Sequence, residues 1–557
     1  MERTWLSQYP PGVPAEIDVG EYQSVRDVFE ESCRKYAKRP AFTCMGRAIT
    51  FAELDALSTT FGGWLQGIGC ARGTRIALMM PNILQYPICV FGALRAGCTV
   101  VNVNPLYTAR ELEHQLVDSG AEVIVVVENF ARTLSQAIAR TPIRHVIVTS
   151  IGELLAVKGR IVDLVLRRVK RMVPPWTLPG AIRFTDAMKA GRKRALSRIP
   201  IGHDDIAFLQ YTGGTTGVAK GAILLHRNIV ANLLQARAWL RPFLDERRRE
   251  VILTPLPLYH IFSLTANCLV FMSIGGENVL ITNPRDIRGM VRTMQGCRFT
   301  AMTGVNTLFN ALLNNARFRR LDFSAFRLTL GGGMAVQEAV AKRWKEVTGV
   351  PLIEAYGLTE TSPAATMNPL HLPQFNGSIG LPIPSTDVVL RDDAGNDVST
   401  GEPGEICIKG PQVMAGYWRR PDETAKAMTP DGYFMTGDIG TMDERGYIRI
   451  VDRTKDMILV SGFNVYPNEI EGIVAMHDGV LECAAVGIPD RKSGEAVKLF
   501  VVRKDDRLTG PALLSHCRRH LAGYKCPREI EFRSDLPKSN VGKILRRELR
   551  DEAKDVA

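Results

Sequence analysis

The chain of 557 residues is 45% apolar and carries a formal net charge of +12. One hydrophobic core does not grow to that length, so we expect at least two domains, and the apolar content excludes a disordered chain. The opening residues, MERTWLSQYP, hold no apolar segment of signal-peptide length, so we expect a cytoplasmic protein.

The spacing of cysteine and histidine excludes two kinds of site. The eleven cysteines are scattered from Cys33 to Cys526 without a C-x-x-C pair, and the nine histidines form no cluster with them. Scattered cysteines in a large cytosolic chain are usually small core residues. We therefore predict neither a disulfide framework nor a structural zinc site.

Strand-like and helix-like segments alternate in the N-terminal part of the chain. Buried strands are predicted at Thr74–Met80, Ala121–Val127 and His145–Thr149, with helices at Gln85–Ala96 and Thr108–Ser119 between them. The second helix opens with threonine and glutamate in capping-box spacing. Such alternation implies an α/β fold, in which helices cover the faces of a largely parallel sheet.

The positive charge is concentrated in one segment. Twelve basic residues lie between Lys158 and Arg198, against only Asp163 and Asp186. Because this excess accounts for most of the net charge, we expect one localised basic face and no general binding of nucleic acid.

A helical wheel of the same segment gives it two sides. The apolar side holds Leu154, Ile161, Val162, Val165, Leu166, Val169 and Met172, and the other holds Arg160, Asp163, Arg167, Lys170 and Arg171. A basic amphipathic helix of this kind can lie on an anionic bilayer. The alternative is a helix that packs on the main domain and leaves a solvated basic face.

The stretch Tyr211–Gly221, YTGGTTGVAKG, contains four glycines, three threonines and a lysine. Glycine lets backbone N–H groups approach phosphate oxygens, and threonine hydroxyls add donors, so the composition predicts a phosphate-binding loop. The flanking apolar runs, Ile206–Tyr211 and Ala222–Leu225, indicate that it joins two strands. A Walker loop is excluded because Lys220 is followed by glycine and not by serine or threonine. A polar surface turn is the alternative.

The longest apolar stretch, Ile261–Gly275, is interrupted by Ser263, Thr265 and Asn267. It is also shorter than the roughly 20 residues of a bilayer-spanning helix. We predict a buried helix here.

Composition changes near Asp452. The preceding region, Ile379–Ile450, is rich in glycine turns and strand-like runs, whereas the residues that follow form a module of roughly domain size. In that module we predict strands near Ala484–Gly487 and Leu499–Val502, and helices near Asn468–Met476 and Gly510–His520. The predicted architecture is therefore a large N-terminal domain of α/β subdomains with a β-rich region, followed by a small α+β C-terminal domain.

The motifs together resemble those of the adenylate-forming enzymes, which include acyl-CoA synthetases, peptide-synthetase adenylation domains and beetle luciferases. After YTGGTTGVAKG come GGGM at Gly331–Met334, YGLTE at Tyr356–Glu360, YFMTGD at Tyr433–Asp438, DRTKDMI at Asp452–Ile458 and PKSNVGKILRREL at Pro537–Leu549. The runs SGFNVYPNEIE at Ser461–Glu471 and WLSQYPPGVP at Trp5–Pro14 narrow the resemblance toward bacterial long-chain fatty-acid–CoA ligases.

The resemblance implies an ATP-dependent ligation of fatty acid to coenzyme A through an acyl-adenylate, with release of AMP and pyrophosphate. It assigns residues 1–452 to the ATP and acyl sites and residues 453–557 to a mobile domain that carries the adenylating lysine. The implied ATP-binding residues are Thr212, Gly213, Gly214, Thr215, Thr216, Gly217, Lys220, Gly332, Gly333, Tyr356, Thr359, Asp438, Arg453 and Lys543. Thr212 and Glu360 are the implied Mg²⁺ ligands, and these two residues with Lys543 are the implied catalytic residues.

Further roles follow from the same resemblance. Lys455 is the implied hinge, and Gly462, Phe463 and Asn464 are the implied coenzyme A contacts. His260 falls at the position of an acyl gate, although a lone histidine is more often a core residue. No carboxylate follows it that could pair with an amine, which disfavours an amino-acid substrate. Val305, Leu308 and Phe309 could line an acyl channel or belong to the core.

Two alternatives remain at this stage. The first is a ligase of medium-chain or aryl acids, and the second is a non-catalytic fatty-acid-binding protein associated with the membrane. We expect peripheral association with the inner face of the cell membrane, since long-chain acids partition into bilayers. The resemblance is also compatible with a homodimer.

Overall fold

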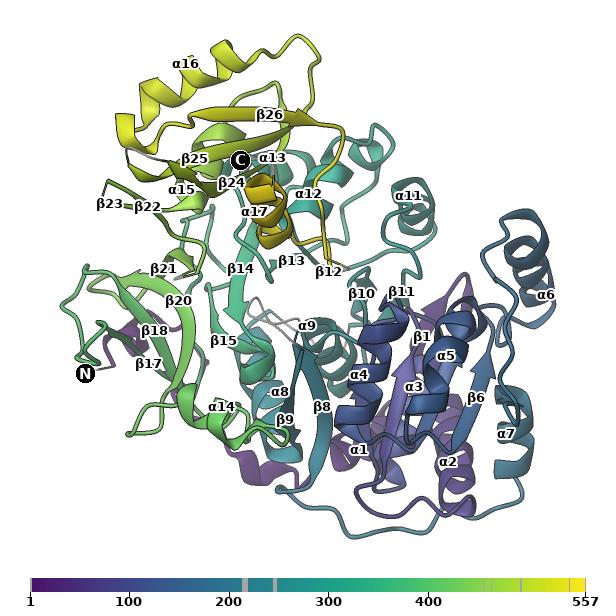
Figure 1. The fold of residues 1–557 in the computed structure, drawn as a ribbon. Helices are drawn as coiled ribbons and strands as arrows, with labels where there is room; N and C mark the ends of the chain where they lie inside the picture. Colours follow the sequence, from purple (N-terminus) through teal and green to yellow (C-terminus); the bar gives the residue numbers. More distant parts are fainter. Residues whose placement is uncertain are drawn as a thin grey trace.

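The computed structural model describes residues 3–555 except 213–218, 244–247, 454, 462, 491–492 and 540. These residues form four β-sheets, three of them in the N-terminal domain and the fourth in the C-terminal domain, which lies across one end of the larger part (Figure 1). The predicted α/β class and the large and small domains are confirmed.

An eight-stranded sheet holds the strands predicted near the N-terminus. In spatial order it contains β19 (Gly416–Tyr417), β9 (Lys220–Leu225), β8 (Ile206–Thr212), β4 (Thr99–Asn102), β3 (Arg75–Met79), β5 (Val123–Val127), β6 (His145–Thr149) and β7 (Ile182–Arg183). All neighbours are parallel except β8–β9 and β9–β19. Because helices cover both faces of a parallel sheet, strands such as β5 are apolar at every position.

The helices of this region are α2 (Phe51–Gly67), α3 (Gln85–Arg95), α4 (Ala109–Ser119), α5 (Ala131–Ala137), α6 (Ala156–Leu164) and α7 (Phe184–Gly191). The predicted capping box of α4 is present: the Thr108 hydroxyl accepts from the Glu111 N–H, and the Glu111 carboxylate accepts from the Thr108 N–H.

A nine-stranded sheet forms the second layer. In spatial order it contains β16 (Leu381–Pro382), β15 (Ala364–Met367), β14 (Leu352–Gly357), β13 (Leu328–Gly331), β12 (Ala301–Gly304), β10 (Val251–Thr254), β11 (Glu277–Leu280), β1 (Pro40–Cys44) and β2 (Arg47–Thr50). The strands from β14 to β1 run parallel. One hydrophobic cluster joins this sheet to the eight-stranded sheet, so the two form one body.

The helices of the second layer are α1 (Val25–Lys35), α8 (His226–Leu240), α9 (Ile261–Ser263), α10 (Val270–Ser273), α11 (Ile287–Gln295), α12 (Asn306–Leu313) and α13 (Glu338–Thr348). The predicted buried helix over Ile261–Gly275 is confirmed with one difference, because a π-helical segment, η6 (Leu264–Leu269), separates α9 from α10. No helix in the described part of the chain is long and apolar enough to cross a membrane.

The glycine-rich region before Asp452 forms a four-stranded antiparallel sheet of β17 (Asp387–Arg391), β18 (Gly404–Lys409), β20 (Phe434–Met442) and β21 (Ile448–Arg453), with the short helix α14 (Pro421–Lys426) beside it. Strand β21 leads directly into the C-terminal domain.

The C-terminal domain is built on five strands: β22 (Ile458–Val460), β23 (Phe463–Val465), β24 (Val480–Asp490), β25 (Gly494–Arg503) and β26 (Glu529–Arg533). Helices α15 (Pro467–Ala475), α16 (Gly510–His520) and α17 (Arg546–Asp555) complete it. Its two hydrophobic clusters contain only residues after Asp452, as expected for a unit with its own core.

Candidate active site

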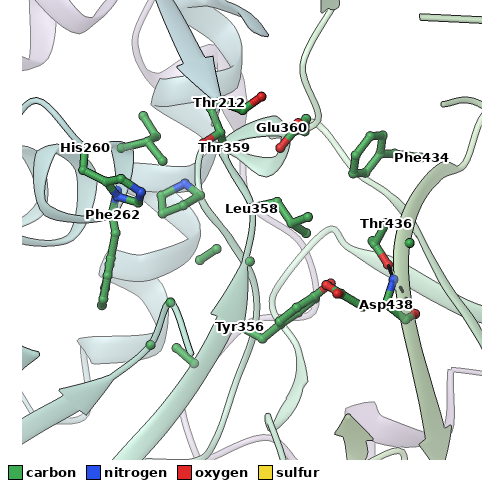
Figure 2. Close-up of a pocket in the computed structure, with 18 of the residues that line it drawn as sticks. Thr212, His260, Phe262, Tyr356, Leu358, Thr359, Glu360, Phe434, Thr436 and Asp438 are labelled. Carbon is green, nitrogen blue, oxygen red and sulfur yellow. Dashed lines mark hydrogen bonds between the residues drawn. The ribbon is translucent and has the colours of Figure 1, made fainter. Parts of the chain in front are cut away.

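A cavity of about 740 Å³ opens where the three N-terminal sheets meet the C-terminal domain. Twelve residues singled out from the sequence line it: Thr212, Lys220, His260, Gly332, Gly333, Tyr356, Thr359, Glu360, Asp438, Arg453, Lys455 and Lys543. They come from segments far apart in the chain, and Figure 2 shows His260 and Asp438 on opposite sides of the cavity, with Thr212 and Glu360 between them. Gly213, Gly214, Thr215, Thr216, Gly217 and Gly462 lie outside the described residues.

One end of the cavity carries a hydrogen-bonded set of polar side chains. Strands β20 and β21 pair Asp438 with Arg453, and the Arg453 Nε donates to Asp438 Oδ1 at 3.0 Å. The Tyr356 hydroxyl, at the end of β14, donates to Asp438 Oδ2 at 2.6 Å. Asp438 is buried, and its orientation is therefore fixed from two sides, while each carboxylate oxygen keeps lone pairs for a ligand.

Two glycines form the floor beside Tyr356. A Cβ on Gly332 would lie 3.1 Å from the Ala355 carbonyl and 3.2 Å from the Phe262 ring, and Gly333 has a φ of +76°. A side chain would fill the space at the first position and strain the backbone at the second. The strand end therefore offers an open peptide surface to a flat ligand.

Glu360 is a buried carboxylate at the middle of the cavity. It lies in η8 (Thr359–Thr361), and its Oε1 accepts from the Tyr417 hydroxyl at 2.8 Å. Burial raises its pKa, which reflects the cost of holding a charge there without a cation. Lys220, at the start of β9, pairs with Glu423 of α14 and lies over the Tyr417 ring.

Lys543 enters the cavity from the C-terminal domain. Its backbone closes a turn in which the Ser539 N–H donates to the Lys543 carbonyl at 2.7 Å. Burial lowers the pKa of its ammonium from 10.5 to about 7, and the charge of Arg453 acts in the same direction. An anion that enters the cavity would therefore stabilise the protonated form of Lys543.

The turn before Lys543 is fastened to the N-terminal domain. The Thr307 hydroxyl of α12 donates to the Gly542 carbonyl at 2.9 Å, and Asn310 Nδ2 donates to the Leu481 carbonyl at 2.9 Å. Gly542 has a φ of +83°, and a Cβ there would lie 2.9 Å from the Thr307 hydroxyl. Glycine at this position therefore permits both the turn and the contact.

His260 and its neighbours form the apolar end. His260 caps α9 by accepting the Phe262 N–H on Nδ1, and burial lowers its pKa to about 4, so the ring is neutral. The apolar lining there is Ala236, Ile261, Phe262, Ala266, Leu330 and Met367. Val305, Leu308 and Phe309 instead belong to the hydrophobic core around α12, which settles that alternative in favour of core.

Phe463 and Asn464 are not brought to this cavity. They lie in β23, both exposed, and the Phe463 ring stacks on Tyr524 at a centroid distance of 4.9 Å. Neither residue lines this cavity or the one described next.

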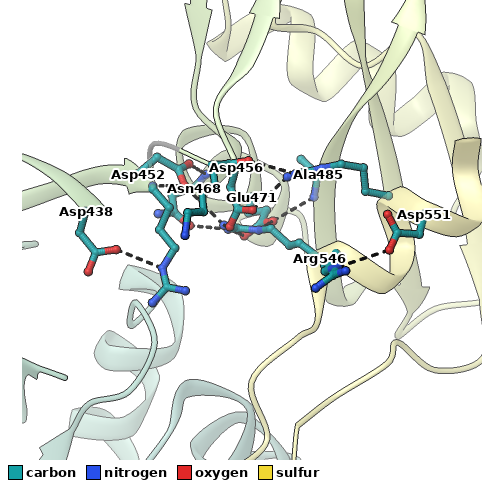
Figure 3. A network of polar contacts seen from close by, with 12 residues as sticks. Asp438, Asp452, Asp456, Asn468, Glu471, Ala485, Arg546 and Asp551 are labelled. Carbon is teal, nitrogen blue, oxygen red and sulfur yellow. Dashed lines mark hydrogen bonds and ion pairs between the residues drawn. The ribbon is translucent and has the colours of Figure 1, made fainter. Parts of the chain in front are cut away.

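A second cavity of about 810 Å³ lies between the domains, and Lys455 and Lys543 line both. Beside it is a half-buried network of polar contacts centred on Arg546 (Figure 3). Arg546 pairs with Glu471 of α15 at 2.6 Å and with Asp452 at 3.5 Å, and Asp452 Oδ2 accepts from the Asn468 N–H at 2.9 Å. Asp452 belongs to β21, in the four-stranded sheet of the N-terminal domain, and its partners belong to the C-terminal domain. These contacts therefore join the two domains on either side of the segment around Lys455.

Three contributors to the site were missed from sequence. Tyr417, Glu423 and Thr307 stand in no glycine-rich motif, and each reaches the site through a long-range contact. The one local signal is the aromatic pair Tyr417–Trp418 directly after Gly416.

Comparisons with known proteins identify the family of the chain. The family model described as AMP-binding enzyme matches residues 29–418, and the AMP-binding enzyme C-terminal domain model matches residues 469–543. The long-chain-fatty-acid–CoA ligase of Yersinia pestis is 59% identical over 554 residues, which cover 99% of this chain and 98% of that protein. The long-chain-fatty-acid–CoA ligase of Salmonella typhimurium is 57% identical over 556 residues, with coverage of 100% and 99%.

Among solved structures, an anthranilate–CoA ligase in complex with anthranoyl-AMP superposes with a TM-score of 0.86 at 26% identity, covering 97% of this chain and 99% of that one.

Proposed function

The chain belongs to the AMP-binding enzymes and, within them, to the long-chain-fatty-acid–CoA ligases, and from this premise we propose how its own residues carry out the reaction. The enzyme ligates a long-chain fatty acid to coenzyme A through an acyl-adenylate, with ATP as co-substrate. The observation that carries the residue-level proposal is the convergence of Lys543, Asp438, Glu360 and Thr212 on one cavity.

The nucleotide binds at the end formed by Tyr356, Asp438 and Arg453. Gly332 and Gly333 accommodate the adenine against the strand end, Tyr356 offers its ring, and the fixed Asp438 carboxylate accepts the ribose hydroxyls. The remaining phosphate contacts are assigned to Gly213, Gly214, Thr215, Thr216, Gly217, Lys220 and Thr359. Lys220 must exchange its Glu423 partner for a phosphate when ATP enters.

Adenylation brings a carboxylate against a triphosphate, so two anions must approach each other. Lys543 lies half-buried between the nucleotide end and the apolar end, where its ammonium offsets charge on the carboxylate and the α-phosphate. Bound anions favour its protonated form and raise its pKa above the value of the empty cavity. The carboxylate oxygen attacks the α-phosphorus, pyrophosphate leaves, and the acyl-adenylate remains.

The residues present fit a magnesium ion. Glu360 is a buried carboxylate that accepts a hydrogen bond from the neutral Tyr417 hydroxyl, and Thr212 adds a hydroxyl oxygen, which suits a hard cation that takes its other ligands from phosphates and water. When bound, the ion would neutralise charge on the phosphates.

The acyl chain occupies the apolar end. The neutral His260 stands at its entrance, and Ile261, Phe262 and Met367 provide apolar contact. No acidic side chain lies beside His260 in α9, which fits an acid without an amine.

The second half-reaction requires another arrangement of the domains. Coenzyme A attacks the acyl carbon through its thiolate and displaces AMP. Of the proposed contacts, Phe463 and Asn464 lie in β23, away from the cavity, and Gly462 lies outside the described residues. We assign residues 1–452 and 453–557 to two bodies with Lys455 as the hinge, so that rotation withdraws Lys543 and brings β23 to the site.

Acid-dependent exchange of pyrophosphate into ATP tests the proposal. The chain should catalyse exchange with oleate and form oleoyl-CoA when coenzyme A is added. A preference for a C6 to C10 acid or for benzoate would favour the alternative substrate classes. Absence of exchange with every acid, despite binding of oleate, would favour a non-catalytic binding protein.

We further propose that the enzyme works as a peripheral protein on the inner face of the cell membrane, because its acid substrate partitions into bilayers. A homodimer is proposed on the family resemblance alone, and sedimentation velocity would test it.

A further inference from the structure

Helix α6 and the π-helical turn η5 (Val165–Val169) carry an apolar stripe without a partner in the described structure. Val157 is 76% exposed, Ile161 61%, Leu164 59% and Val169 74%. The first three are spaced four and three residues apart and therefore share one face of the helix. Figure 1 shows α6 at the periphery of the molecule, beside α7 and away from the C-terminal domain.

The opposite face of the same helix is fixed to the body. The Asp163 carboxylate accepts from the Gly152 N–H at 2.8 Å, and the backbones of Gly152 and Gly159 touch so closely that a Cβ on Gly159 would lie 1.8 Å from the Gly152 carbonyl oxygen. Arg167 makes a two-pronged pair with the buried Glu128 at 2.8 and 2.9 Å. The outward stripe is therefore held in place by specific inward contacts.

This arrangement corrects the helical wheel drawn from the sequence. Leu154 and Val162 pack against the main core, and Arg167 anchors the helix through Glu128. The wheel assumed one regular α-helix, whereas the π-helical turn changes the residue spacing after Leu164. The exposed apolar set is consequently Val157, Ile161, Leu164, Val169 and Met172.

Basic side chains border this stripe. Arg160, Arg168, Lys170 and Arg171 are exposed, and no carboxylate among the described residues pairs with them. The one acidic residue between positions 154 and 185, Asp163, is turned inward. The face therefore combines apolar contact with uncompensated positive charge.

We propose that this outward face of residues 157–172 docks the enzyme on an anionic phospholipid bilayer. The inference rests on the proposed function, since the bilayer is the reservoir of the acid substrate. An apolar stripe with a basic border matches a membrane surface that is apolar at depth and negative at the headgroups. A symmetric pairing of two copies would set the same arginines against each other, which disfavours a second copy as the occupant.

Sedimentation of the full chain with vesicles tests the inference. The native protein should bind phosphatidylcholine vesicles that contain phosphatidylglycerol and bind pure phosphatidylcholine roughly tenfold or more weakly, because several basic residues act together. The triple variant Val157→Ser, Ile161→Ser, Leu164→Ser changes only exposed positions and should fold normally. It should lose most of the vesicle binding.

A charge variant and a matched control separate specific docking from general attraction. Reversal to glutamate at Arg168, Lys170 and Arg171 should abolish the preference for phosphatidylglycerol. The same reversal at the exposed Arg317, Arg319 and Arg320, at and beside η7 (Phe318–Arg320), should leave it unchanged. Equal losses in the two variants would overturn the assignment of this face.

Activity distinguishes this inference from the proposed function. Both docking variants should turn over vesicle-borne oleate more slowly and a water-soluble shorter acid at the native rate. Unchanged vesicle binding in both variants would refute the docking face while leaving the ligase intact. The proposal is overturned if the native protein does not bind vesicles. It is also overturned if the stripe variant binds vesicles normally and changes only its oligomeric state in sedimentation, which would assign the face to a protein partner.

Discussion

Replacement of Lys543 by alanine should remove the adenylating half-reaction and spare the second. Lys543 lines the cavity from the C-terminal domain, as Asp438 and His260 do from the N-terminal domain, and it is half-buried there. The Thr307 hydroxyl donates to the Gly542 carbonyl in the turn that carries it, and Asn310 holds strand β24 of the same domain through the Leu481 carbonyl, so the ammonium is placed by the fold and not by substrate. Loss of the Lys543 side chain should therefore leave the cavity in place but without this ammonium.

The size of the effect follows from Coulomb's law. Two unit charges about 4 Å apart interact by about 4 kcal/mol at an effective dielectric constant of about 20. If most of that attraction is realised as charge develops in the transition state, the rate of adenylation should fall by about a thousandfold, since about 1.4 kcal/mol corresponds to a factor of ten.

The assay compares two reactions of the same variant. Oleate-dependent exchange of pyrophosphate into ATP reports adenylation, and formation of oleoyl-CoA from supplied oleoyl-adenylate reports thioester formation. We expect a loss of about a thousandfold in the first and less than about tenfold in the second. Equal losses in both reactions would refute the view that Lys543 leaves the site between them.

A stability measurement controls for misfolding. The pKa of Lys543 is about 7 in the folded chain and about 10.5, the ordinary value for lysine, in the unfolded chain. The unfolded state therefore binds more protons between those pH values. Stability of the native protein should therefore rise with pH across that window, and Lys543→Ala should lose this slope without becoming less stable. A marked fall in its melting temperature would indicate damage to the fold.

Three further predictions concern neighbouring groups. In exchange assays kcat/KM should fall above about pH 7 as the free enzyme loses the Lys543 proton, whereas kcat should persist to higher pH because bound anions raise that pKa; coincident limbs would contradict this. Phe463→Ser should slow thioester formation and spare exchange, and the reverse pattern would misplace the coenzyme A contact. Asp452→Asn weakens the acceptor of the Asn468 N–H and removes the charge facing Arg546, so exchange should slow by roughly tenfold while thioester formation from oleoyl-adenylate does not. An unaffected exchange rate would show that Asp452 does not hold the adenylating orientation.

Much of the fold could be predicted because its signals are local. The strands β5 and β6 are continuous apolar runs, since both faces of a parallel sheet are buried, and the Thr108 capping box marks the start of α4. The loop from Tyr211 was placed between two strands, and β8 and β9 are those strands, paired antiparallel. The order of strands within each sheet depends on contacts between distant segments and was not predictable.

The candidate site divides in the same way. Motif residues such as Asp438 and Lys543 could be named because each stands in a recognisable run, and the cavity contains them. Tyr417 and Thr307 could not be named, because their roles depend on hydrogen bonds to residues far away in the chain. Tyr417 donates to Glu360, and Thr307 donates to the Gly542 carbonyl. The wheel of residues 154–172 failed in part because burial of Leu154 and Val162 is decided by the neighbouring core.

The central claim, an acyl-adenylate made in the first half-reaction, is tested most directly by a single-turnover experiment without coenzyme A. Enzyme mixed with ATP, magnesium and labelled oleate should release one pyrophosphate per site and retain labelled oleoyl-AMP. A chase of coenzyme A should then convert that label to oleoyl-CoA and release AMP with the same amplitude. Formation of ADP and phosphate, or no pyrophosphate until coenzyme A is added, would contradict the account.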